Sequence, residues 1–150
     1  MLRSYSHLVV AALALTTFAG EPFTAGQRIL FQGDSITDGN RGRNADPNHI
    51  LGHGYVFLIA ADLGGHRPDL RLDFVNRGVS GNTVEDLARR WKADMLDLKP
   101  DVLSVLIGVN DAGAAWREQK PFDVAAFERT YDRLLTDARA ANPARRWRWR

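Results

Sequence analysis

The sequence of 150 residues contains no cysteine. Disulfide bonds, thiolate chemistry and cysteine-ligated zinc are therefore excluded. The sequence also lacks clustered metal-ligand spacing, internal repeats and low-complexity linkers, so no metal or other cofactor is expected. Its length is that of one domain.

The chain also has no excess of basic residues along its main body. The formal net charge is +2, but the surplus is confined to the two ends. Without Arg3 and the arginines at 145, 146, 148 and 150, fifteen basic residues face eighteen acidic ones. The body of the chain is thus mildly acidic, which argues against nucleic acid as a partner.

The N-terminal residues are typical of a secretory leader. Arg3 supplies a positive charge, the apolar run 8–15 is too short to span a bilayer, and the segment 17–19 offers small residues at cleavage spacing. We expect residues 1–20 to be a signal peptide and the protein to be secreted or periplasmic, with no stable membrane anchor after cleavage. An apolar N-terminal helix or an uncleaved anchor is the alternative.

The most informative segment surrounds Ser35. The apolar run 29–31 predicts a buried strand, and Gly33, Asp34 and Ser35 follow at its end. Open α/β sheets bind ligands at the carboxyl ends of their strands. A glycine beside the serine lets the chain turn sharply and lets a ligand approach closely. An ordinary turn with a capping serine would give the same pattern.

Two later segments repeat this arrangement. Residues 74–83 read as a strand followed by a glycine-rich turn that contains Gly81, and the strand at 102–107 is followed by Gly108-Val109-Asn110-Asp111. In a parallel sheet these turns gather at one edge. We therefore expect Ser35, Gly81 and Asn110 to lie together.

The rest of the chain alternates between strand and helix patterns. We expect a helix over 54–63 that Gly64 and Gly65 close, a strand over 70–75, a helix over 83–91, and a longer helix between Asp123 and Pro143. Such alternation implies a parallel sheet with helices on both faces.

With three such turns in order, the chain resembles the SGNH hydrolases, also called the GDSL esterase/lipase family, from about Arg28 to about Asn142. The resemblance implies a flavodoxin-like α/β/α sandwich with a parallel sheet, of which about three of the usual five strands are present. It also implies three catalytic positions: Ser35 as nucleophile, and the N–H of Gly81 and the side-chain amide of Asn110 as oxyanion donors. Such donors each contribute roughly 3–4 kcal/mol.

The family's late Asp-x-x-His block, which supplies the general base, has no counterpart here. The four histidines are His7, His49, His53 and His66, and all precede the third block. A serine hydroxyl is a weak nucleophile without a base. We therefore expect little or no esterase activity from this chain, with His49 or His53 as a substitute base the alternative.

The last residues, 144–150, alternate arginine and tryptophan. This pattern does not suit a buried parallel strand. We interpret the chain as C-terminally truncated, for example by a frameshift. The expected division is a signal peptide at 1–20, a partial SGNH hydrolase domain at 21–143 and an aberrant tail at 144–150. A basic aromatic tail that binds nucleic acid or a membrane surface is the alternative.

The loop after Ser35 is polar, and the stretches 37–43 and 51–55 resemble the branch of the family that includes carbohydrate acetyl esterases. We therefore expect a small-molecule or carbohydrate ester as substrate, with small acyl groups such as acetyl. Three other functions remain open. They are a non-catalytic carbohydrate-binding remnant of the fold, a lysophospholipase-like lipid esterase, and a phosphate or nucleotide binder that uses residues 33–39 as an anion loop.

Overall fold

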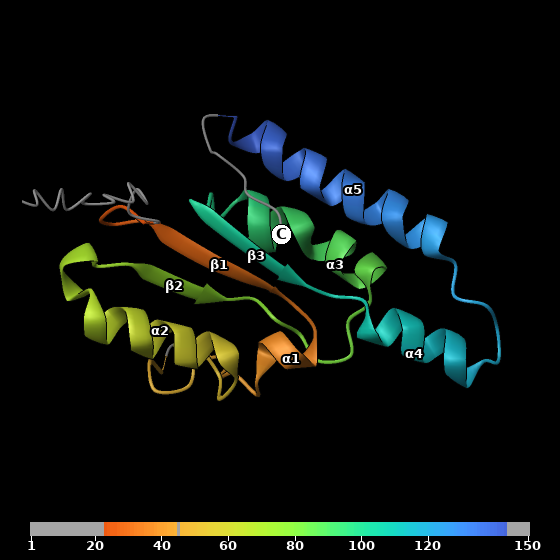
Figure 1. Ribbon diagram of the computed structural model, residues 1–150, viewed down its shortest axis with the longest axis horizontal. Helices are drawn as coiled ribbons and strands as arrows, with labels where there is room; N and C mark the ends of the chain where they lie inside the picture. The colour runs from red at the N-terminus through yellow and green to blue at the C-terminus, as the bar shows by residue number, and fades with distance from the viewer. Residues whose placement is uncertain (1–22, 45, 144–150) are drawn as a thin grey trace, which may run out of the picture.

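The computed structural model describes residues 23–44 and 46–143, so the expected signal peptide at 1–20 and the tail at 144–150 lie outside the described residues. Strands and helices alternate along the chain (Figure 1). The elements are β1 (Arg28–Gly33), α1 (Ser35–Asp38), α2 (Tyr55–His66), the 3-10 helix η1 (Pro68–Leu70), β2 (Asp73–Asn76), α3 (Val84–Trp91), the π-helix η2 (Lys92–Leu96), β3 (Val102–Leu106), α4 (Val109–Arg117) and α5 (Val124–Ala141).

Within the described residues the strands form one parallel sheet in the order β2-β1-β3. Leu30 of the central strand is in register with Val75 on one side and Leu103 on the other. The apolar run of β1 explains its central place, because a strand buried on both faces needs a near-continuous apolar sequence. The predicted α/β class with a parallel sheet is confirmed.

The two faces of the sheet are covered by different helices (Figure 1). Leu30 packs against α3, η2 and α5, where Leu87, Met95 and Leu134 are buried. Ile29 and Phe31 point to the other face and pack against Val56 of α2. Alternate residues of β1 thus anchor opposite layers, which gives the helix–sheet–helix arrangement expected from the sequence.

Three predicted boundaries differ from the structure. Helix α2 does not stop at Gly64 and Gly65 but continues to His66, because a glycine weakens a helix without ending it. Strand β2 begins only at Asp73, since the preceding residues form η1. The helix at 83–91 is followed directly by η2 before the chain reaches β3.

Helix α4 is an element that the sequence analysis did not predict. The sequence pattern predicts a turn at Asn110 and Asp111, yet they lie in the first turn of this helix. Gly108 precedes it with φ +125°, a conformation that favours glycine. Asn110 therefore lies on a helix that begins right after β3.

Candidate active site

Ser35 begins helix α1, directly after β1. The side chain of buried Asp34 caps this short helix by accepting a hydrogen bond from the N–H of Ile36 at 3.0 Å. A side chain at Gly33 would collide with Thr37 and with the carbonyl oxygen of Leu106, so only glycine fits before the turn. Ser35 itself is exposed, and within the described residues its hydroxyl and its N–H have no hydrogen-bond partner.

Gly81 lies in the loop between β2 and α3. Its φ of +83° is in the left-handed region, and the space around the position of a Cβ is empty. No described group accepts a hydrogen bond from the N–H of Gly81. This N–H is therefore a free donor at the surface of the loop.

Asn110 links α4 to the same loop. Its Nδ2 donates to the carbonyl oxygen of Asn82 at 2.9 Å. The next residue, Asp111, accepts a hydrogen bond from the N–H of Val84 at 3.1 Å. Burial raises the pKa of Asp111, although that N–H opposes the shift. Two hydrogen bonds thus connect the first turn of α4 to Asn82 and Val84 at the start of α3.

The structure places Ser35, Gly81 and Asn110 at one edge of the sheet. The strands before them are parallel neighbours, so their carboxyl ends meet. In Figure 1, α1, α4 and the loop that leads into α3 lie at this end of the sheet. A hydrogen bond from the N–H of Val79 to the carbonyl oxygen of Gly33 at 3.1 Å joins the two segments that carry the serine and the glycine.

Arg90 of α3 makes hydrogen bonds to residues at the carboxyl ends of β1 and β2. Its Nε donates to the side-chain oxygen of Asn82 at 2.7 Å. Its Nη atoms donate to the carbonyl oxygens of Arg77 at 2.7 Å and of Gly33 at 3.0 Å. It also contacts Gln32 and Asp94. One half-buried cation thus holds the ends of β1 and β2 together.

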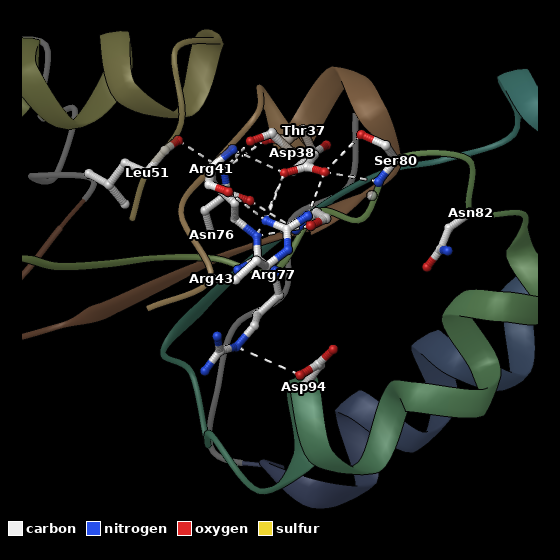
Figure 2. A network of polar contacts seen from close by, with 12 residues as sticks. Thr37, Asp38, Arg41, Arg43, Leu51, Asn76, Arg77, Ser80, Asn82 and Asp94 are labelled. Carbon is white, nitrogen blue, oxygen red and sulfur yellow. Dashed lines mark hydrogen bonds and ion pairs between the residues drawn. The ribbon is translucent and has the colours of Figure 1, made fainter. Parts of the chain in front are cut away.

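Asp38, the last residue of α1, links this helix to the loop after β2. Its buried carboxylate accepts hydrogen bonds from Arg43 and from both the N–H and the hydroxyl of Ser80 (Figure 2). Burial by itself would raise the pKa of Asp38, but these hydrogen bonds outweigh burial and lower the pKa to about 2. Asp38 is therefore ionised throughout the physiological range.

The described histidines make no hydrogen bond to Ser35 in this structure. His49 and His53 are exposed, with ring centroids 5.5 Å apart, and His66 pairs with Asp62 on α2. None of these three donates to or accepts from Ser35. His7 lies outside the described residues.

The described residues contain neither a candidate metal cluster nor a candidate membrane span. In residues 23–44 and 46–143, histidine and carboxylate side chains do not gather in threes as metal ligands would. Over the same part of the chain, every helix falls short of the length or apolar character needed to cross a bilayer.

Sequence reasoning named the residues that lie at the strand ends but missed those that hold them in place. Asp38, Ser80 and Arg90 were not singled out. Asp38 lies one helical turn after Ser35, and this spacing was the available signal. The contacts of Arg90 and Ser80 join segments far apart in sequence, so no local pattern revealed them.

Comparison with known proteins gives a consistent result. The sequence profile of the GDSL-like Lipase/Acylhydrolase family matches residues 31–147. An acetylxylan esterase of Geobacillus stearothermophilus is 44% identical over 96 residues, which are 63% of this chain and 42% of that protein. The lipoprotein YqeF of Bacillus subtilis is 33% identical over 116 residues, which are 77% of this chain and 44% of that protein.

Solved structures share the fold. A protein from Parabacteroides merdae, described as a GDSL-like lipase, superposes with a TM-score of 0.75 and 39% identity, over 81% of this chain and 57% of its own. Axe2, an acetylxylan esterase from Geobacillus stearothermophilus, superposes with a TM-score of 0.71 and 35% identity, over 79% of this chain and 57% of its own. The chain therefore spans less than half the length of the curated relatives and somewhat more than half of the solved ones.

Proposed function

The chain belongs to the GDSL-like lipase/acylhydrolase family, and we propose from this premise that it carries the nucleophile and the oxyanion donors of a carboxylic ester hydrolase. The observation that supports this most directly is the free N–H of Gly81, at the same sheet edge as the exposed Ser35. A free donor beside an exposed serine is what an acyl-transfer site requires.

The proposed reaction follows from these groups. The Ser35 Oγ attacks the ester carbonyl carbon and its proton passes to a base. The bond to the alcohol then breaks while the base returns the proton to the leaving oxygen, and water hydrolyses the acyl-serine to release the acid and restore the serine hydroxyl. The negative charge that develops on the carbonyl oxygen is stabilised by the N–H groups of Ser35 and Gly81 and by the amide of Asn110. Asn110 uses one N–H for Asn82, which leaves the second for the oxyanion.

We propose acetyl and similar small acyl groups on carbohydrates as the substrate class. The acetylxylan esterase similarity supports this class. The loop after α1 is also polar, with Arg41, Arg43 and Asn44, and offers no long apolar stretch for an acyl chain.

The missing base limits what these 150 residues do alone. No histidine follows Asn110 in the sequence, and none of the described ones contacts Ser35. General base catalysis typically contributes 10²–10⁴-fold. We therefore propose little or no esterase activity for the chain as given. The same observation favours a second candidate function, carbohydrate binding without turnover.

We also propose that the protein is exported and that the chain divides into three segments. Residues 1–20 would be removed as a signal peptide, so the exported protein would begin near Gly20 or Glu21. Residues 21–143 would form the partial hydrolase domain, followed by the separate tail 144–150. Similarity to a lipoprotein agrees with export. Intact mass of exported material tests this, and a retained Met1 would contradict it.

Hydrolysis of 4-nitrophenyl acetate tests the proposed function. The chain as given is compared with Ser35→Ala and with a version extended by an Asp-x-x-His block. We expect activity in the extended version, its loss in extended Ser35→Ala, and little activity without the extension. Ordinary enzyme rates from the unextended chain, abolished by Ser35→Ala, would contradict the proposal on the base and indicate His49 or His53. Carbohydrate binding that Ser35→Ala leaves intact, without turnover in any version, would favour the binding function.

A further inference from the structure

The Asp38 carboxylate bridges two segments that are far apart in sequence. Arg43 donates to its two oxygens at 3.0 and 2.7 Å, and the N–H of Arg41 donates at 3.1 Å. From the other side, Ser80 donates from its N–H at 3.0 Å and from its hydroxyl at 2.8 Å. Asp38 and Ser80 are separated by 42 positions, so this contact is tertiary.

The two ends of the bridge lie next to the proposed catalytic groups. Asp38 is the last residue of α1, the helix that begins with Ser35. Ser80 immediately precedes Gly81, whose N–H is free. The carboxylate therefore fixes the loop before Gly81 relative to the helix of the nucleophile, as Figure 2 shows for Asp38 and Ser80.

We propose that Asp38 is a positioning residue that aims the N–H of Gly81 at the oxyanion by holding Ser80; this inference rests on the proposed function. A free N–H at φ +83° has no hydrogen bond of its own to fix its direction. Its orientation depends on its neighbours. On one side Asn82 is held by Asn110 and Arg90, and on the other side Ser80 is held by Asp38.

The charge of Asp38 is what suits it to this role. An ionised carboxylate only accepts hydrogen bonds, and every group that contacts its oxygens is a donor. Hydrogen bonds to an ionised group are about twice as strong as neutral ones. Asparagine has the same shape but would turn an N–H₂ group toward some of these donors. Asp38→Asn therefore weakens the hold on Ser80 without changing the volume of the side chain.

The test uses phenylboronic acid, which forms a tetrahedral adduct with a serine hydroxyl and so imitates the oxyanion without needing turnover. Binding to the 150-residue chain is measured by calorimetry, and hydrogen exchange of the Ser80 and Gly81 amides is followed by NMR. We expect Asp38→Asn and Ser80→Ala each to weaken boronate binding about 10- to 100-fold, the scale of a displaced reacting group. Ser80→Thr keeps the hydroxyl and restores binding.

Two further results are expected if the residues act as one unit. The double variant Asp38→Asn/Ser80→Ala binds boronate about as weakly as either single variant. The Ser80 amide exchanges faster in Asp38→Asn. The matched control is Asp97→Asn, which breaks an exposed ion pair with Lys92 at 2.6 Å and leaves boronate binding unchanged.

The outcomes separate the two proposals. Boronate binding that is absent, or that Ser35→Ala does not change, contradicts the proposed function and with it the role of Asp38. Binding that depends on Ser35 but is unaffected in folded Ser80→Ala overturns the inference alone. Because Ser80 is exposed, Ser80→Ala keeps the test decisive even if Asp38→Asn does not fold.

Discussion

Arg90 donates a hydrogen bond from Nη2 to the carbonyl oxygen of Gly33, with the two atoms 3.0 Å apart. Gly33 lies two residues before Ser35, and the same guanidinium contacts Asn82, the residue after Gly81. One side chain of α3 therefore holds the backbone next to the proposed nucleophile and the side chain of the residue that follows a proposed oxyanion donor.

Arg90→Gln is expected to destabilise the protein by about 3 kcal/mol, because it leaves several part-buried acceptors without their donor. Urea unfolding followed by circular dichroism measures the change. The control is the neighbouring Arg89→Gln, which breaks only an exposed ion pair with Asp86 and is expected to cost less than about 1 kcal/mol. Equal effects of the two variants would contradict the importance assigned to Arg90.

Gly78→Ala tests how closely the loop after β2 packs on α1. A Cβ at this position would collide with the backbone N of Asp38 and lie 2.6 Å from the carbonyl carbon of Thr37. Backbone atoms cannot move aside, so we expect a loss of about 3 kcal/mol or failure to fold. Gly64→Ala in α2 meets nothing within 4 Å and is expected to stabilise by up to about 1 kcal/mol. A Gly78→Ala protein as stable as the wild type would contradict this packing.

The pKa of Asp38 predicts an acid-sensitive contribution to stability. Folding lowers this pKa from the ordinary value of 3.8 to about 2, so the unfolded chain binds the proton more readily. The contribution, about 2 kcal/mol, is fully present above pH 4 and is lost as the pH falls from about 4 to 2.

Urea unfolding at several pH values between 2 and 6 measures this contribution. Asp38→Asn should be less stable than the wild type at pH 6, and the difference should shrink toward pH 2. A difference between the two proteins that stays constant over this range would contradict the assigned pKa.

The sequence predicted the sheet and the strand-end positions because these depend on local patterns. The apolar run of β1 and the turns at Gly33, Gly81 and Gly108 are all visible in a few consecutive residues. The parallel order of the sheet then follows from the alternation with helices. The sequence therefore predicts that Ser35, Gly81 and Asn110 lie at one edge of the sheet, whereas their catalytic roles are a proposal.

What the sequence did not reveal depends on distant contacts or on weak local signals. Helix α4 begins at a Val-Asn-Asp segment with low helix propensity, and its start is held by Asn82 and Val84 of another segment. The partners of Asp38 and Arg90 likewise come from other parts of the chain.

Asn110→Ala separates the structural contribution of the amide from its proposed part in oxyanion binding. Loss of the hydrogen bond to Asn82 is expected to cost about 1 kcal/mol of stability. Loss of an oxyanion donor is expected to weaken phenylboronate binding about 100-fold. Asn142→Ala is the matched control, because Asn142 Nδ2 also donates to a backbone carbonyl, that of Pro100 at 3.5 Å. This contact joins the end of α5 to the residues just before β3, away from the proposed site. Boronate affinity should stay unchanged in this control. If both variants lost stability alike and kept wild-type boronate affinity, Asn110 would be a structural residue and not an oxyanion donor.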